Sequence, residues 1–170
     1  MGNGPRSRTT SPVAVVPPAD PTPAEPIVTD PVAAGKSAFK RGQAKLKVED
    51  LEGAIIELAR AVELVPNEID YAATLAWARF CSASDKLELA QATREALHKA
   101  IRKSQTPEIA RFYLGRVERM LGRDKEALRH FQEVLEVQPK HADAAAEVRV
   151  IEARLAESAP RDNGLFGRKR

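Results

Sequence analysis

Two stretches of this 170-residue chain place the same kinds of residue at the same spacing. Small, apolar and helix-ending residues recur in the same order in both copies, which consist of Gly42, Ala54, Leu58, Ala61 and Pro66, and of Gly115, Ala127, Phe131, Val134 and Pro139. Residues 35–157 are rich in Ala, Leu, Glu, Arg and Lys and lack strand-like alternation, which favours helices. An internal repeat of this kind predicts a stacked array of helix pairs, each ended by a proline.

A weaker copy lies between the two. Leu75 and Ala76 stand where the other copies place a large apolar residue and a glycine, and Ala96, Ala100 and Pro107 follow. This middle unit is longer than a period of about 34 residues by roughly five. We expect the additional residues between its two helices, around residues 82–87.

The third copy resembles the tetratricopeptide-repeat family, whose unit is a helix-turn-helix. The residues that carry the resemblance are Leu114-Gly115, Gly122 at the turn between helices, Ala127, Phe131 and Pro139. The resemblance implies an all-α fold of three helix pairs in a right-handed superhelix, with units at about 35–68, 69–107 and 108–141. The chain is also similar to the C-terminal repeat modules of bacterial multidomain proteins. This similarity implies a protein of the cytoplasm.

The stretch after Pro139 has the pattern of a capping helix at residues 141–157. Its apolar residues lie at helical spacing on one stripe, namely Ala144, Val148, Ile151 and Leu155. Its other face carries charges, namely Asp143, Glu147, Arg149, Glu152 and Arg154. An end unit needs this arrangement, because it covers an apolar face without presenting a new one. The predicted folded body is therefore residues 35–158.

Both ends of the chain differ from this body in composition. Eight of the 12 prolines lie before residue 35, so we expect residues 1–34 to be a disordered arm. The whole excess charge of +3 lies in residues 159–170, which we expect to be a flexible basic tail. A nearly neutral body argues against nucleic acid as a partner, and no apolar run is long enough for membrane insertion. Weak contacts of the tail with an anionic surface or RNA stay open.

The sequence offers no chemistry of its own. His98, His130 and His141 fall in separate segments without further ligands at metal spacing, so we expect no metal site. The single cysteine, Cys81, fits a reducing compartment and a structural role. No catalytic triad, phosphate loop or dinucleotide motif is present, so we expect neither catalysis nor a cofactor.

The resemblance implies that the first helix of each unit lines a concave groove that binds a partner protein or peptide. In the register of the family, the groove residues are Lys36, Phe39, Lys40, Gln43, Lys47, Thr74, Trp77, Phe80, Phe112, Tyr113, Arg116 and Arg119. The same register adds Leu46, Ala73, Cys81 and Ile109. Cations around aromatic side chains suit a peptide or helix with apolar anchors and some acidic residues. The aromatic residues fit a second interpretation equally well, in which they are core residues beneath a neighbouring helix.

Some proteins of the family hold the C-terminal carboxylate of chaperones with Lys and Asn side chains. The corresponding positions here carry Phe39, Gln43, Thr74, Ile109 and Tyr113, which argues against that ligand. Non-catalytic partner binding is the predicted function. The alternative is a structural component that assembles with itself, its groove filled by its own arm or by another copy.

Overall fold

A computed structural model describes Met1 and residues 30–158 of the chain. The described part contains helices and no strand, so the prediction of an all-α fold is confirmed. The helices are α1 (Pro31–Lys47), α2 (Leu51–Leu64), α3 (Ile69–Ser82), α4 (Lys86–Lys103), α5 (Glu108–Met120), α6 (Asp124–Val137) and α7 (Ala142–Ser158). Most of the predicted arm and all of the predicted basic tail lie outside the described residues.

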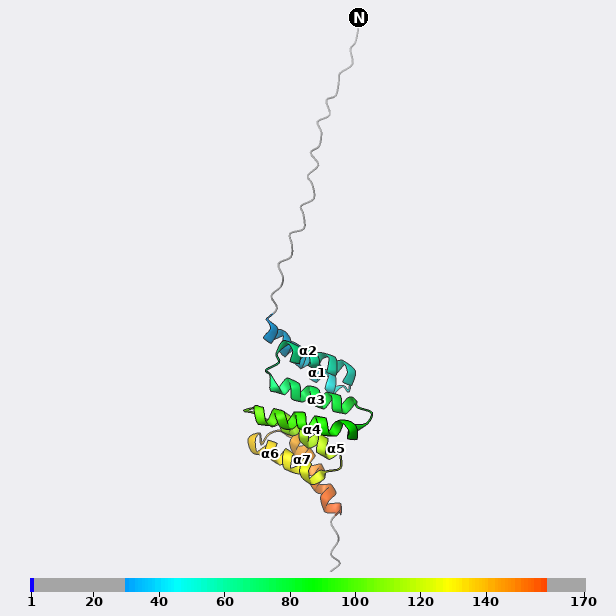
Figure 1. Cartoon of the computed structure of the whole chain (residues 1–170), viewed down its shortest axis with the longest axis vertical. Helices are drawn as coiled ribbons and strands as arrows, with labels where there is room; N and C mark the ends of the chain where they lie inside the picture. The colour runs from blue at the N-terminus through cyan, green and yellow to red at the C-terminus, as the bar shows by residue number, and fades with distance from the viewer. Residues whose placement is uncertain (2–29, 159–170) are drawn as a thin grey trace, which may run out of the picture.

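The helices are stacked along the long axis of the molecule and lie across that axis (Figure 1). Each helix packs on the next one in the chain, and α3 also packs on α5. Three pairs result, α1 with α2, α3 with α4 and α5 with α6, and α7 follows at the far end (Figure 1). No helix among the described residues is both long and apolar enough to cross a membrane.

The first helix begins earlier than residue 35, the predicted start of the folded body. Asp30 is its N-cap, with a side-chain oxygen that accepts a hydrogen bond from the Val32 backbone nitrogen at 2.9 Å. Pro31 occupies the first turn, where a missing N–H costs nothing and the fixed φ suits a helix. The last four residues of the predicted arm therefore belong to α1, and Pro31 starts a helix.

The additional residues of the middle unit are not in the turn around residues 82–87. That turn spans residues 83–85 and is as short as the turns at 48–50 and 121–123. The helix itself is longer, because α4 has 18 residues where α2 and α6 each have 14. Four residues correspond to about one helical turn, so α4 gains a turn without changing the face that it buries.

The buried positions of α4 show where this turn was added. Thr93, Leu97 and Ala100 are buried at the spacing that Ala54, Leu58 and Ala61 have in α2. Ala96, which the sequence pattern matched to the repeat, is exposed. The added turn therefore lies at the N-terminal end of α4. Because of this turn, Thr93 and not Ala96 occupies the buried position that Ala54 has in α2, so a match based on alanines alone picks the wrong residue.

Two glycines are needed where paired helices touch. A Cβ on Gly42 would lie 2.6 Å from Cγ of Leu58, and a Cβ on Gly115 would lie 2.8 Å from Cε1 of Phe131. Both partners are fully buried and cannot retreat. The repeated glycines of the two sequence copies therefore lie where the paired helices approach each other closely.

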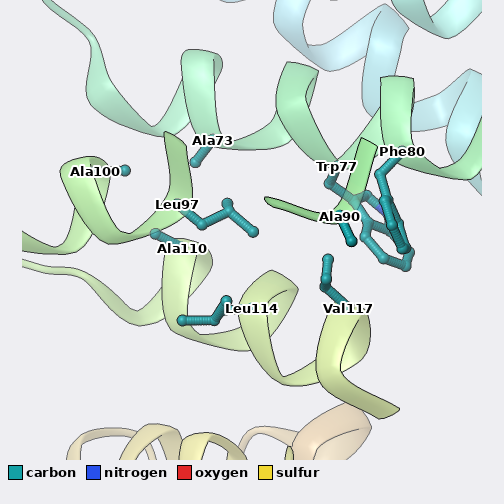
Figure 2. Close-up of a cluster of buried hydrophobic side chains, with 9 residues drawn as sticks. All are labelled: Ala73, Trp77, Phe80, Ala90, Leu97, Ala100, Ala110, Leu114 and Val117. Atoms are coloured by element: carbon teal, nitrogen blue, oxygen red, sulfur yellow. The ribbon is translucent and has the colours of Figure 1, made fainter. Parts of the chain in front are cut away.

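The core runs through the stack as a series of clusters. The central cluster joins α3, α4 and α5, and Figure 2 shows Trp77 and Phe80 of α3 beside Ala90 and Val117 within it. Another cluster packs the apolar stripe of α7 against Phe112 and Phe131 of the last pair. A buried ion pair adds a polar link, with Arg94 Nε of α4 at 2.7 Å from Oε1 of Glu118 of α5. Neighbouring pairs thus share one continuous core.

Candidate functional site

A groove of about 620 Å³ opens where the first helices of the three pairs come together. Six of the predicted groove residues line it, namely Gln43, Lys47, Trp77, Phe112, Tyr113 and Arg116. Leu46 and Cys81, from the same register, also line it. The groove therefore draws side chains from α1, α3 and α5, as the repeat architecture requires.

The last helix supplies a wall that the sequence reasoning missed. A second hollow of about 390 Å³ shares Phe112, Arg116 and Asp143 with the groove and continues it along Glu147 and Val150 of α7. Asp143 and Glu147 were expected on the solvated face of a cap. The sequence did contain a signal for this wall. Asp143 and Glu147 are one helical turn apart, and α7 stands where the first, groove-lining helix of a fourth pair would stand.

Two of the predicted groove residues belong to the core instead. Thr74 and Phe80 are fully buried, since α3 is covered by α4 on one side and by α5 on the other. Trp77 and Phe112 keep only 5% and 9% of their surface exposed, so each presents no more than an edge to the groove. For these aromatic residues the core interpretation holds, and the groove is less aromatic than the sequence predicted.

Lys36, Phe39, Lys40 and Arg119 do not line the groove itself. Phe39 is half-buried and stacks on Tyr71 of α3, with 4.3 Å between ring centroids. Lys36 and Lys40 are exposed. They share one face of α1 with the groove residues Gln43 and Lys47. Arg119 points to α7, with Nε 3.0 Å from Oε2 of Glu147.

Arg116 contacts groove residues from three helices. Its guanidinium lies 5.0 Å from the ring centroid of Trp77 and 5.6 Å from that of Phe112. Its Nε is 3.5 Å from Oε1 of Glu147, which also pairs with Arg119. Glu147 offsets one of these two positive charges, and Asp143 of α7, which lines the same hollow, offsets the other, so this end of the groove is close to neutral.

The α1 side of the groove keeps a positive charge. The helix has five basic residues and no acidic one. Arg41 pairs with Glu57 at 2.8 Å and Lys45 pairs with Asp50 at 2.6 Å, and these contacts lower the pKa of both carboxyl groups. Within the described residues Lys36, Lys40 and Lys47 form no ion pair.

The groove offers no activated nucleophile. Burial raises the pKa of the Cys81 thiol to about 11, so at neutral pH the sulfur is protonated and unreactive. Tyr113 stacks on Trp77 with 5.5 Å between centroids, and burial raises its pKa as well. These groups can supply an apolar wall and hydrogen bonds, which suits binding.

Two histidines meet between the second helices of neighbouring pairs, although they lie in separate segments of the sequence. His98 of α4 and His130 of α6 have ring centroids 6.5 Å apart in an edge-on arrangement. Burial, followed by the charges of His98, Arg111, Arg129 and Arg94, lowers the pKa of His130 to about 4. No set of three or more His, Cys, Asp or Glu side chains in the described residues is arranged to hold a metal ion.

Comparison with known proteins agrees with this geometry. The sequence profile of the tetratricopeptide repeat matches residues 109–141, which hold the third helix pair. The TPR domain of OM64 from Arabidopsis superposes with a TM-score of 0.55 at 23% identity, covering 75% of this chain and 98% of that one. The chain has the tetratricopeptide-repeat fold.

Two further structures share the fold at similarly low identity. The first TPR of Spaghetti (RPAP3), bound to the HSP90 peptide SRMEEVD, has a TM-score of 0.57 and 20% identity, with 74% of this chain and 98% of that one covered. A crystal structure of MamA has a TM-score of 0.51 and 20% identity, with 72% and 68% covered. No curated protein matches by sequence. The profile match falls on the unit in which the sequence pattern is most complete, whereas the longer α4 separates the middle unit from the family pattern.

Proposed function

We propose that this chain is a non-catalytic interaction module whose concave groove binds an extended or helical segment of a partner protein. The observation that carries the proposal is the groove of about 620 Å³, to which α1, α3, α5 and α7 all contribute side chains. The Spaghetti domain, with the same fold, is bound to a peptide. A single cysteine suits work in a reducing compartment such as the cytoplasm.

The walls of the groove define the partner segment. The lysines of α1 that form no ion pair within residues 30–158 favour acidic residues at that end, and a rim charge of this kind steers association. Leu46 of α1, Trp77 of α3 and Tyr113 of α5 form an apolar section in the middle of the groove. An apolar anchor in the middle of the groove, with acidic residues toward α1, satisfies both sections.

The peptide bound by the Spaghetti domain is a poor candidate for this groove. The positions that hold a terminal carboxylate in some relatives carry a buried Thr74 and a Phe39 stacked on Tyr71 here. Only Gln43 among them offers a polar side chain to the groove. We therefore propose a partner other than a chaperone C-terminus.

Affinity capture with the full chain tests the proposal. The Lys40→Glu/Lys47→Glu variant reverses two exposed charges on the face of α1 that borders the groove, and it leaves the core intact. Lys99→Glu/Arg102→Glu makes the same change on exposed positions of α4 and serves as the matched control. Partners captured by the wild type and the control, and lost at least tenfold from the groove variant, support the proposal. Equal capture by all three proteins, with unchanged helical circular dichroism, excludes the groove as the binding surface.

A further inference from the structure

The groove has a charge order along its length. Lys47 and Glu49 line its α1 end, and Lys36 and Lys40 continue the same exposed face of α1 beyond the groove. Within residues 30–158 these three lysines form no ion pair. Its middle is apolar, and at its far end Asp143 and Glu147 of α7 offset the charges of Arg116 and Arg119. A segment that fits this order is acidic where it passes α1 and apolar where it reaches α3 and α5.

The chain itself contains a segment with this order, in residues 2–29. Counted outward from the start of α1, Glu25 and Asp20 come first and the apolar run Val13–Val16 follows. No lysine or arginine lies between residue 9 and Lys36. The charge of this segment is therefore complementary to that of the helix to which it is joined.

The length of the segment also fits. The 17 residues of α1 span about 25 Å at a rise of about 1.5 Å per residue. A proline-rich chain in an extended conformation covers about 3.1 Å per residue, so roughly eight residues run the length of α1. Residues 20–29 are therefore long enough to span α1 as far as Lys47, which leaves Val13–Val16 available for the apolar section.

We propose that residues 13–28 of this chain occupy its own groove, with Asp20 and Glu25 against the lysines of α1 and Val13–Val16 beside Tyr113 and Trp77. The proposal rests on the groove of the proposed function and adds a competitor for it. A tethered segment acts at a high effective concentration, commonly in the millimolar range. A partner must therefore displace the arm. The groove then binds only those segments that bind it more tightly than the arm does.

The only tryptophan of the chain lines the groove and provides the test. In the full chain with Cys81→Ser, a nitroxide spin label on Val15→Cys quenches Trp77 fluorescence when the arm is docked. The same label on Ser7→Cys, farther out on the arm, is the matched control. Reduction of the nitroxide in each protein gives the unquenched reference.

The expected result is a fall of Trp77 fluorescence to less than half with the label at position 15, and a much smaller fall at position 7. Docking also predicts that Lys40→Glu/Lys47→Glu removes the quenching and that Asp20→Lys/Glu25→Lys added to that variant restores it. Equal, weak quenching from both labels overturns the proposal. Quenching that disappears on dilution overturns it too, because a second copy is then the occupant. Neither result touches the proposed function, which depends on partner capture.

Discussion

The guanidinium of Arg116 lies 5.0 Å from the ring centroid of Trp77, between α5 and α3. It lies over the indole ring, on which Tyr113 also stacks, and only 5% of Trp77 is exposed. The groove wall at this point is therefore a charged side chain over an aromatic one. The properties of the wall depend on the arginine more than on the tryptophan beneath it.

Arg116→Ala is expected to uncover Trp77 without unfolding the protein. The tryptophan emission shifts to longer wavelength because water reaches the ring, and the free energy of unfolding falls by about 1 kcal/mol with the loss of the cation–π contacts. Fluorescence spectra and urea unfolding measure both effects. Arg129→Ala, an exposed arginine of α6, is the control that leaves the emission unchanged. An unshifted spectrum in Arg116→Ala contradicts this account of the wall.

Trp77→Ala is expected to destabilise the whole array. The indole belongs to the cluster that joins α3, α4 and α5, and replacing a buried aromatic by alanine costs about 3 kcal/mol or more. Urea denaturation followed by circular dichroism gives the midpoint. Trp77→Phe, which keeps an aromatic ring, should retain most of the stability. A native-like midpoint for Trp77→Ala would show that the indole is not part of the core.

Gly42→Ala is expected to lower stability although alanine is the better helix former. The new methyl group would lie 2.6 Å from Cγ of the fully buried Leu58. Overpacking of this kind costs about 1–3 kcal/mol, which exceeds the propensity gain of about 1 kcal/mol. Thermal unfolding measures the change. Gly42→Ala combined with Leu58→Ala tests the cause, because the double variant should lose less than the sum of the two single changes.

The pH dependence of stability should contain a contribution from His130. Its folded pKa of about 4 lies below the ordinary value near 6.5, so the unfolded chain takes up the proton first as the pH falls. Neutral His130 therefore contributes its full share to the free energy of unfolding above about pH 6.5, and this contribution is lost as the pH falls from about 6.5 to 4. Glu133, with Oε2 at 3.9 Å from Nδ1, is shared with Arg111 and Arg129 and offers little compensation.

Unfolding free energies of the wild type and of His130→Gln at pH 7 and pH 4.5 isolate this contribution. The wild type should lose about 2 kcal/mol more than the variant over this interval. The carboxylates titrate in both proteins and cancel in the comparison. Parallel pH profiles for the two proteins would place His130 in a more hydrated site than the structure does.

The sequence was sufficient for the architecture because each pair obeys the same local rules. Gly42 with Leu58, and Gly115 with Phe131, are spaced alike and report one contact in two copies. The prediction for the middle unit, which put its additional residues between the two helices, was wrong. A helix can gain a turn of about 3.6 residues and keep its buried face, so the additional residues went into α4 and not into a loop.

The groove was harder to predict than the fold. A helical register assigns residues to a face, and it correctly brought Gln43, Lys47 and Arg116 to one hollow. It does not say how closely α4 and α5 cover α3, which decided the burial of Phe80. The role of Glu147 was invisible because it depends on the docking of α7 against α5, a contact between residues far apart in the chain.

Removing Arg94 is expected to be far more harmful than removing a surface arginine. Glu118 is 2% exposed and depends on Arg94 Nε at 2.7 Å, with Arg123 farther away at 3.7 Å. Removing the nearest cation from a buried carboxylate costs up to about 3 kcal/mol, of which Arg123 can offset a part. Urea unfolding of Arg94→Ala should show a loss of this order. Glu118→Gln in the same background should recover part of it, and no recovery would mean that the loss comes from packing of the arginine stem.

The turns after α1 and α5 carry different residues in the same left-handed conformation at equivalent positions, so substitutions there should have opposite effects. Gly122 has φ 75° and a Cβ there would meet nothing within 4 Å, whereas Glu49 adopts φ 61° with a side chain in place. A left-handed conformation costs a non-glycine residue about 1 kcal/mol. Glu49→Gly should therefore raise, and Gly122→Ala lower, the free energy of unfolding by up to about that amount. Because Glu49 also lines the groove, partner capture should be measured for Glu49→Gly beside its stability. Equal destabilisation by both changes would show that the Glu49 side chain makes contacts that outweigh its backbone strain.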